Sequence, residues 1–379
     1  MQDNLSYWER KNFFKADVIV IGSGIVGLNA AITIKQNNPK LAVIVLERGF
    51  FPAGASTKNA GFACFGSISE LIEQEKLTGS DGLHQLISKR WQGLLKLRGL
   101  LGDEKIEYRN LGGYELFKPD QDILAEECVS KMSHFNTLIE DIVLQKNVFK
   151  QSNSKINTFG FAGVDVLIEN TLESQIDPGK MMKALFTMAL SLGIQILNSC
   201  KVEMVLAEGS QMNIHTDQGV FGCKKVLATT NAFINELFPD LAVVPGRGQV
   251  IVTKPISDLK LRGTFHYDKG YYYFRNIDNR VLLGGGRNLD MKAEETTDFG
   301  ETLLVQNELA HLLKDMILPD TNFEIEYKWS GIMAFGPQLA PIIEEIQPNV
   351  FCAVRCNGMG IAIGSHTGQE VGELVLNSF

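Results

Sequence analysis

The stretch that decides the fold is residues 17–47, which read DVIVIGSGIVGLNAAITIKQNNPKLAVIVLE. Residues 17–21 form a β-branched run, which is typical of a parallel strand buried on both faces. Three glycines follow this run and open an apolar helical segment, and residues 41–46 give a second buried strand. Because the two strand patterns flank a helix, the stretch predicts a βαβ unit of an α/β protein.

The glycines of this stretch, Gly22, Gly24 and Gly27, match the pattern G-x-G-x-x-G between a strand and a helix. In that context Gly22 allows a tight turn, Gly24 lets the backbone approach a pyrophosphate, and Gly27 lets the helix pack closely on the strand. The free N–H groups of the helix N-terminus favour the phosphates. The stretch therefore predicts a dinucleotide site, to which Ile25 and Val26 also belong.

An acidic residue, Glu47, ends the second strand twenty residues after Gly27. Its carboxylate can accept hydrogen bonds from both hydroxyls of a ribose and repels a 2′-phosphate, which disfavours NADP. We expect Arg48 beside it in the same site. The glycine pattern alone does not separate FAD from NAD.

The composition narrows the class of protein. The chain has 379 residues, a net charge of −8 and no C-x-x-C pair among its six cysteines. We therefore expect about two domains, no nucleic-acid partner and free thiols in a reducing cytoplasm. The six histidines are scattered, so we expect no metal site. The apolar run 18–34 is short and rich in glycine, which argues against a transmembrane or targeting segment.

Further along the chain, helical and strand patterns alternate. Residues 107–118 indicate a hairpin or paired strands, and residues 248–287 form a β-rich block that is dense in tyrosine. Four short strands are expected at 195–197, 201–206, 213–215 and 225–228, and a last one at 350–354. Helical spacing is found at 82–101, 121–144, 177–193, 302–316 and 361–376.

Five further segments resemble the D-amino acid oxidase/glycine oxidase family of flavoproteins, in the same order along the chain. They are Gly54–Gly61, Asp177–Asn231, Tyr272–Gly286, Trp329–Ile343 and Asn357–Gly368. The resemblance implies FAD as cofactor and a two-domain, glycine-oxidase-like α/β fold. It pairs a discontinuous Rossmann-type FAD-binding domain with a mainly antiparallel substrate domain. The expected division is an N-terminal arm (1–15), an FAD-binding domain (16–81, 160–232 and 336–379) and a substrate domain (82–159 and 233–335).

The resemblance also implies which residues meet the cofactor. The loop like 54–61 lies beside the flavin in that family, Val202 resembles a residue near the adenine, and Thr230 and Asn231 resemble a turn near the dinucleotide. The remaining implied cofactor residues are Ala55, Ser56, Lys58, Asn59, Ala60, Gly61, Gly331, Asn357, Gly358, Met359, Gly360 and Ile361. The last five form a turn before a helix, whose N-terminus suits the negative charge of reduced flavin. One site would thus unite the two ends of the chain.

The substrate side departs from the family pattern. Members that oxidise amino acids often carry an arginine, which grips the substrate carboxylate, where this chain has Met333. The γ-glutamylputrescine oxidase-like branch also lacks that arginine. Either the substrate is an amine without this grip, or another arginine serves, with Arg247, Arg275 and Arg287 as candidates.

Two further residues are implied on the substrate side. Tyr272 lies where the family has a substrate-binding tyrosine. Strand alternation places Tyr271, Tyr273 and Arg275 on the opposite face. Arg355 stands where the family often has glycine, so it faces either the flavin and substrate or the solvent.

The reaction implied is oxidation of a C–N bond of a small amine or amino acid by hydride transfer to flavin N5, with oxygen or another acceptor taking the electrons. No cysteine occurs between Cys223 and Cys352, near the segment where some members attach flavin covalently, so we expect non-covalent FAD. No catalytic side chain is predicted. The alternatives are an FAD-dependent 2-hydroxyacid or polyol dehydrogenase, a flavin-binding protein without turnover, and an NAD-dependent dehydrogenase.

Overall fold

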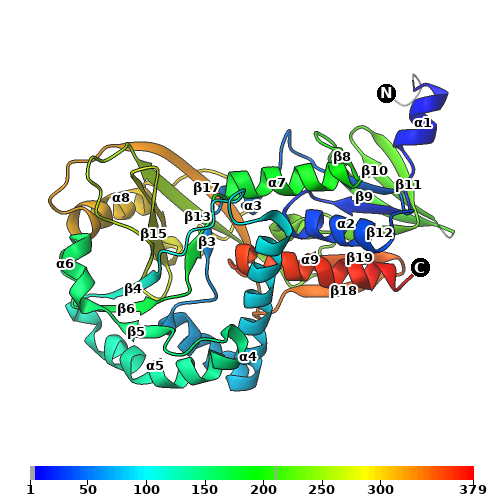
Figure 1. Ribbon diagram of the computed structural model, residues 1–379. Coiled ribbons are helices and arrows are strands. Elements are labelled where there is room, and N and C mark those ends of the chain that lie inside the picture. The colour runs from blue at the N-terminus through cyan, green and yellow to red at the C-terminus, as the bar shows by residue number, and fades with distance from the viewer. Residues whose placement is uncertain (1–4, 210) are drawn as a thin grey trace.

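The computed structural model describes residues 5–209 and 211–379, and its two largest sheets form separate lobes (Figure 1). The smaller lobe is built on a six-stranded sheet in the order β18-β19-β12-β1-β2-β8. All neighbouring pairs in this sheet are parallel except β18 with β19. The strands are β1 (Val18–Ile21), β2 (Val43–Leu46), β8 (Gln195–Leu197), β12 (Lys225–Ala228), β18 (Ile342–Gln347) and β19 (Val350–Val354).

Strand alternation explains how this sheet is covered on both faces. Val18 and Val20 of β1 pack against helices, whereas Ile19 and Ile21 pack under a three-stranded sheet. The helices are α2 (Ile25–Asn37), α7 (Pro178–Ser191) and α9 (Gly360–Leu376), and the small sheet is β9 (Val202–Glu208), β10 (Gln211–Thr216) and β11 (Gly219–Cys223). A strand buried on both faces is the arrangement that the continuous apolar run predicts.

The helices α2 and α9 lie side by side, although they are at opposite ends of the chain (Figure 1). Glycines of α9 make this contact close, since a Cβ on Gly368 would lie 2.6 Å from Cβ of Asn29. Each helix directly follows a parallel strand, α2 after β1 and α9 after β19. Their N-termini therefore emerge at the same edge of the sheet, where its strands end.

The larger lobe is an eight-stranded sheet in the order β17-β13-β16-β15-β14-β4-β6-β5. One face of it packs on α8 (Leu303–Leu312) and the turn that follows, while α4 (Ile68–Leu101) and α5 (Asp122–Val143) cover the β5 and β6 end. Its strands are β4 (Gly113–Phe117), β5 (Phe149–Gln151), β6 (Val166–Asn170), β13 (Val244–Thr253), β14 (Thr264–Tyr267), β15 (Tyr272–Ile277), β16 (Arg280–Gly285) and β17 (Ile325–Phe335). The pair β4 with β14 is parallel, and the other pairs named for this sheet are antiparallel.

Several details differ from the sequence prediction. The strand β6 pairs with β4 and β5 of the larger sheet, although the predicted FAD-binding domain includes it. Helix α4 begins at Ile68 instead of near residue 82 and kinks at Gly79, where φ is 71°. Only β4 forms a regular strand in the region 107–118. The predicted arm contains a helix, α1 (Tyr7–Phe13), which is capped by Ser6 and Glu9.

Two predictions about the whole chain can be compared with the structure. All six cysteines are free thiols, and five of them are buried. Within the described residues, no helix combines the length and the apolar character that a membrane crossing requires.

Candidate active site

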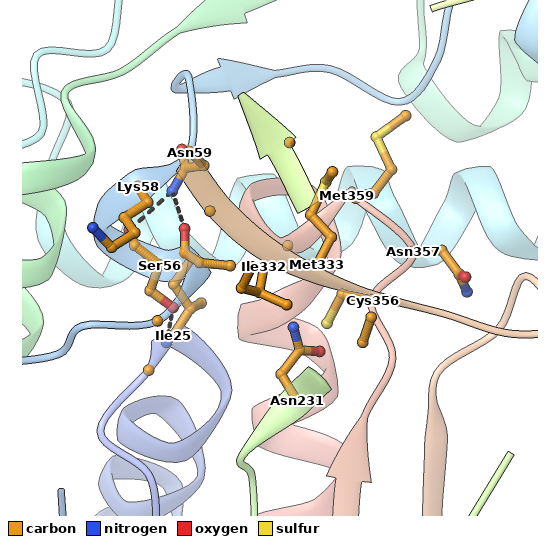
Figure 2. A pocket seen from close by; sticks show the side chains of 18 of the residues that line it. Ile25, Ser56, Lys58, Asn59, Asn231, Ile332, Met333, Cys356, Asn357 and Met359 are labelled. Atoms are coloured by element: carbon orange, nitrogen blue, oxygen red, sulfur yellow. Dashed lines mark hydrogen bonds between the residues drawn. The ribbon is translucent and has the colours of Figure 1, made fainter. Parts of the chain in front are cut away.

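A cavity of about 800 Å³ lies between the edge where the six-stranded sheet ends and the strands β13, β15, β16 and β17 of the larger sheet. Its wall includes every residue predicted to hold the cofactor except Gly27. Figure 2 shows how distant segments meet here, with Ile25 and Ser56 from the start of the chain and Asn357 and Met359 from its end. The structure therefore brings the two predicted glycine turns to one cavity.

The first turn is fixed by steric contacts of its glycines. Gly22 has a φ of +102°, which only glycine adopts readily. A Cβ on Gly27 would collide with the carbonyl oxygen of Gly22 and lie 2.6 Å from Oγ1 of Thr229. Gly27 thus lies behind the cavity wall and lets α2 pack on β1. The backbone N–H of Ile25 donates to Ser56 Oγ at 3.0 Å, while Gly22 and Gly24 line the cavity.

The carboxylate of Glu47 is held in place at the end of β2. One oxygen accepts from Ser23 N at 3.1 Å and from Ser23 Oγ at 2.7 Å, and the other accepts from Gly49 N at 2.9 Å. The residue is only 7% exposed and faces the cavity. A carboxylate with fixed orientation and further lone pairs suits the hydroxyls of a ribose.

The second turn, residues 357–361, leads into α9. Asn357 and Gly358 have φ values of 48° and 79°, and the Asn357 amide donates to the carbonyl oxygens of Gln338 and Leu339. This anchoring leaves the backbone of Gly360, at the start of the helix, on the cavity wall. A helix N-terminus at this place offers unpaired N–H groups and a positive dipole end to an anionic ligand.

The loop at 54–61 forms a short helix, α3 (Ala55–Lys58), whose end is braced by Asn59. The Asn59 amide donates to the carbonyl oxygens of Ala55 and Ser56 (Figure 2), and its oxygen accepts from Gly61 N. Lys58 lies 5.1 Å from the Phe299 ring, and its carbonyl oxygen accepts from the Trp329 indole at 2.9 Å. The loop is therefore fixed against β17 and forms one side of the cavity.

Three observations show that the nucleotide end of the cavity fits a dinucleotide. Two helix N-termini face it, the Glu47 carboxylate lies on its wall, and Thr230 Oγ1 is buried there without a hydrogen-bond partner among the described residues. A buried hydroxyl without a partner is rare in native proteins and is explained by a ligand or a water. Val202 and Asn231 complete this part of the wall.

The substrate end of the cavity is formed by the larger sheet. Tyr271, Tyr273 and Met333 lie on its wall, whereas Tyr272 packs into the core under α8. Strand alternation predicts that Tyr271 and Tyr273 lie on the face opposite to Tyr272, as the structure shows. The structure does not bring Tyr272 to the cavity, where the family resemblance implies a substrate-binding tyrosine. Burial raises the pKa of Tyr273 to about 12, so its hydroxyl stays protonated and can donate a hydrogen bond. Met333 lies between β13 and the second turn (Figure 2), 3.8 Å from where a Cβ on Gly358 would stand.

The two arginines predicted to bind substrate are not on the wall. Arg275 is 2% exposed and donates to the carbonyl oxygens of Gly61 and Ile176, at 3.1 and 2.8 Å. Burial lowers the pKa of Arg275 to about 10. Arg355 faces neither cavity nor solvent, because its guanidinium donates to the carbonyl oxygens of Ala242 and Ala340. Both arginines therefore hold neighbouring loops in place.

The two remaining candidates differ from each other. Arg247 forms a two-point ion pair with Glu294, at 2.8 and 3.1 Å. Arg287 lies on the cavity wall, with its guanidinium 4.0 Å from the Phe335 ring. It forms no hydrogen bond or ion pair within the described residues.

A buried charged group lies beside the substrate end. His266 Nε2 lies 2.6 Å from a carboxylate oxygen of Glu173, which also accepts from Thr264. Burial disfavours the charged form of His266, but Glu173, Glu70 and Glu115 outweigh burial and raise its pKa to about 9. Atoms of Cys64, Glu173 and His266 that could bind a metal lie within 4.8 Å of one another. A protonated histidine does not bind a metal, so we describe His266 and Glu173 as an ion pair. The absence of a metal site stays a prediction.

Sequence reasoning missed Phe62, Glu70, His266 and Cys356, which also line this cavity. Glu70 and His266 belong to segments with no motif, so the sequence carried no signal for them. Phe62 directly follows the segment Gly54–Gly61, and Cys356 directly precedes the glycine turn at residue 357, so adjacency to a motif was a signal for both.

Comparison with known proteins agrees with this geometry. A family model described as FAD dependent oxidoreductase matches residues 17–374. A curated relative, "Probable oxidoreductase OrdL" of Haemophilus influenzae, is 25% identical over 390 aligned positions, which cover 95% of this chain and 83% of the relative.

Solved structures agree on the fold. An L-proline dehydrogenase from P. horikoshii has a TM-score of 0.76 at 18% sequence identity, and the alignment covers 96% of this chain and 94% of the dehydrogenase chain. A glycine oxidase from Geobacillus kaustophilus has a TM-score of 0.75 at 19% sequence identity, and the alignment covers 96% of this chain and 95% of the oxidase chain. The chain therefore shares the fold of these two proteins.

Proposed function

The chain belongs to the family of FAD dependent oxidoreductases, and we propose that it oxidises the C–N bond of an amine or amino acid. The observation that carries this proposal is the continuity of the cavity. Its nucleotide end has two helix N-termini and Glu47, and its other end is enclosed by Tyr271, Tyr273 and Met333. Glycine oxidase and L-proline dehydrogenase, which share the fold, are named for amino acid substrates, and this supports the assignment.

The proposed cofactor contacts follow from the two turns. The amides at the start of α2, with Gly22 and Gly24, would hold the pyrophosphate, and Glu47 would hold the ribose. The turn at residues 357–361 would lie beside the flavin ring. Bound FAD supplies a hydride acceptor at flavin N5 and, once reduced, carries negative charge that a helix N-terminus stabilises.

The wall at the substrate end favours the reactive form of an amine. Ile332 and Met333 are apolar, and an apolar surrounding disfavours an ammonium ion relative to the neutral amine. The neutral nitrogen can form a C=N bond with its lone pair as the neighbouring carbon loses a hydride to the cofactor. The resulting iminium ion is then hydrolysed by water to a carbonyl compound and an ammonium ion. The residues of the wall orient the substrate and exclude water until that point.

We propose that the FAD is held without a covalent bond. Cys64, Cys200 and Cys356 line the cavity, and burial raises the pKa of all three thiols, that of Cys356 to about 12. Such thiols remain protonated near neutral pH and are weak nucleophiles.

An anaerobic screen of amines, amino acids and 2-hydroxyacids tests the function. Loss of flavin absorbance at about 450 nm reports hydride transfer. We expect amines or amino acids to bleach the flavin and hydroxyacids to leave it unchanged. As a control, acid denaturation should release the FAD into the supernatant. Bleaching by hydroxyacids alone, or by no compound of the three classes, would overturn the proposal, and a colourless purified protein would overturn the cofactor assignment.

A further inference from the structure

Arg287 is a cation on the cavity wall that has no hydrogen-bond or ion-pair partner among residues 5–209 and 211–379. It follows β16 through Gly286, whose φ is +80°, and it starts a short 3-10 turn, Arg287–Leu289. Its guanidinium lies 4.0 Å from the ring centroid of Phe335 and 5.9 Å from that of Tyr271. Stacking on the face of an aromatic ring fixes the guanidinium plane and leaves its N–H edges free to donate.

The other arginines near the cavity are already engaged. Arg247 pairs with Glu294, Arg48 pairs with Glu236, and Arg275 and Arg355 donate to carbonyl oxygens. Burial lowers the pKa of Arg287, so its surroundings oppose the charge without an anion to offset that cost. A bound anion would remove this mismatch.

Two glycines of β13 let the neighbouring side chains lie against this strand. A Cβ on Gly246 would lie 2.6 Å from the Phe335 ring and 3.6 Å from Nη1 of Arg287, so Gly246 makes room for the ring on which the guanidinium stacks. A Cβ on Gly248 would lie 2.9 Å from Cε of Met333. Gly248, Arg287 and Met333 all line the cavity, so a ligand in the cavity can reach the arginine without a β13 side chain at Gly248 in between.

The charges around the cavity favour a singly charged group. Glu70 and Glu73 lie on the same wall, and the carboxylate of Glu173 lies behind His266. These acidic groups would repel a phosphate dianion, which also needs more than one cationic partner. A carboxylate matches the two parallel N–H groups of a single guanidinium.

We propose that Arg287 binds a carboxylate carried by the substrate, so that the substrate is an amine with a carboxylate group. The proposal rests on the proposed function and adds the substrate class. The carboxylate is held beside β16, two strands away from the strand that carries Met333. Met333 contributes an apolar contact, and the single guanidinium decides between charged and neutral relatives of the same amine.

Binding of unreactive probes tests this assignment independently of turnover. Butanoate, pentanoate and hexanoate are titrated into the holoenzyme against the matched amides, and the change in flavin absorbance is followed. We expect the best carboxylate to bind about 10- to 100-fold more tightly than its amide. Arg287→Met should abolish this preference, and Arg287→Lys should keep part of it. Arg262→Gln removes a charge from an exposed residue off the cavity wall and should leave the preference unchanged.

Three outcomes would overturn the assignment. They are an equal affinity of the wild type for carboxylates and amides, an unchanged preference in Arg287→Met, and equally tight displacement by chloride or inorganic phosphate. If the carboxylate preference is found and depends on Arg287 while no amine bleaches the flavin, the anion site stands and the proposed reaction fails. If amines bleach the flavin with equal kcat/KM whether or not they carry a carboxylate, the reaction stands and the role of Arg287 fails.

Discussion

We expect the two ends of the cavity to recognise their ligands by different means. At the nucleotide end, Gly22, Gly24 and Glu47 belong to one continuous stretch, in which the glycines act through backbone geometry and Glu47 through its carboxylate. At the substrate end, Tyr273, Arg287 and Met333 come from β15, the end of β16 and β17, and act through their side chains. We therefore expect substitutions at the first end to be poorly tolerated, and single substitutions at the second end to change the ligand.

The largest effect at the nucleotide end is expected from adding a methyl group at Gly27. In Gly27→Ala the new Cβ would collide with the Gly22 carbonyl and with Thr229 Oγ1. We expect the free energy of unfolding to fall by about 1–3 kcal/mol, a typical cost of overpacking a core, and FAD to be lost. Thermal unfolding and the flavin content of the purified protein measure both effects.

The matched substitution is Gly360→Ala at the second helix N-terminus, where the new Cβ would have no atom within 4 Å in the described part of the chain, apart from its chain neighbours and the backbone of its own helix. This variant should keep the stability of the apoprotein and bind FAD more weakly, since the methyl group points into space that we assign to the cofactor. Equal stability and equal flavin content of Gly27→Ala and the wild type would contradict the account of the nucleotide end.

A smaller effect is expected from Glu47→Gln, which keeps the shape of the side chain and removes its charge. The amide group can accept through one oxygen only, so its NH₂ would face either Ser23 or Gly49, both of which donate to the carboxylate. We expect the Kd of FAD to rise about 10- to 100-fold, as for a lost hydrogen bond to a charged group.

Titration of the apoprotein with FAD gives this Kd. Glu203→Gln is the control, because Glu203 is exposed on β9 beside Val202 and off the cavity wall. If Glu47→Gln binds FAD as tightly as this control, Glu47 stabilises the glycine turn but does not bind the cofactor.

The difference between the two ends of the cavity also explains which of their residues could be predicted from the sequence. The strand, turn and helix at the nucleotide end are consecutive, so spacing of Gly22, Gly24, Gly27 and Glu47 suffices to place them at one site. Resemblance to a family added the second turn, and the contact of α9 with α2 explains why that turn lies at the same edge. Local pattern and helix geometry therefore determine this end.

The substrate end depends on contacts that no local pattern contains. Alternation separates Tyr272 from Tyr273, but only the packing of α8 decides which of them is buried in the core. Arg275 shares the face of Tyr273, yet the distant carbonyl oxygens of Gly61 and Ile176 engage it. The choice of Arg287 among several arginines follows from these long-range contacts.

The smallest predicted effect is a dependence of Tm on pH that arises from His266 at the substrate end. The pKa of His266 is about 9 in the folded protein and about 6.5 in an unfolded chain. Its ion pair with Glu173 therefore stabilises the fold fully below about pH 6.5, and this contribution is lost as the pH rises through about 9. We expect a decrease of a few degrees in Tm between about pH 6.5 and about pH 9, measured by thermal unfolding at a series of pH values.

His266→Gln separates the titration from the hydrogen bond. Glutamine can still donate to Glu173 but does not titrate, so the decrease in Tm over this pH range should disappear while the flavin content stays that of the wild type. Glu70 and Glu115 also face His266, and the Phe62 ring lies 5.3 Å from it. If the variant and the wild type lose Tm in parallel over this range, the charge of His266 does not contribute to stability. If the variant instead loses FAD, the two ends of the cavity are coupled, and the division between backbone and side-chain recognition fails at this residue.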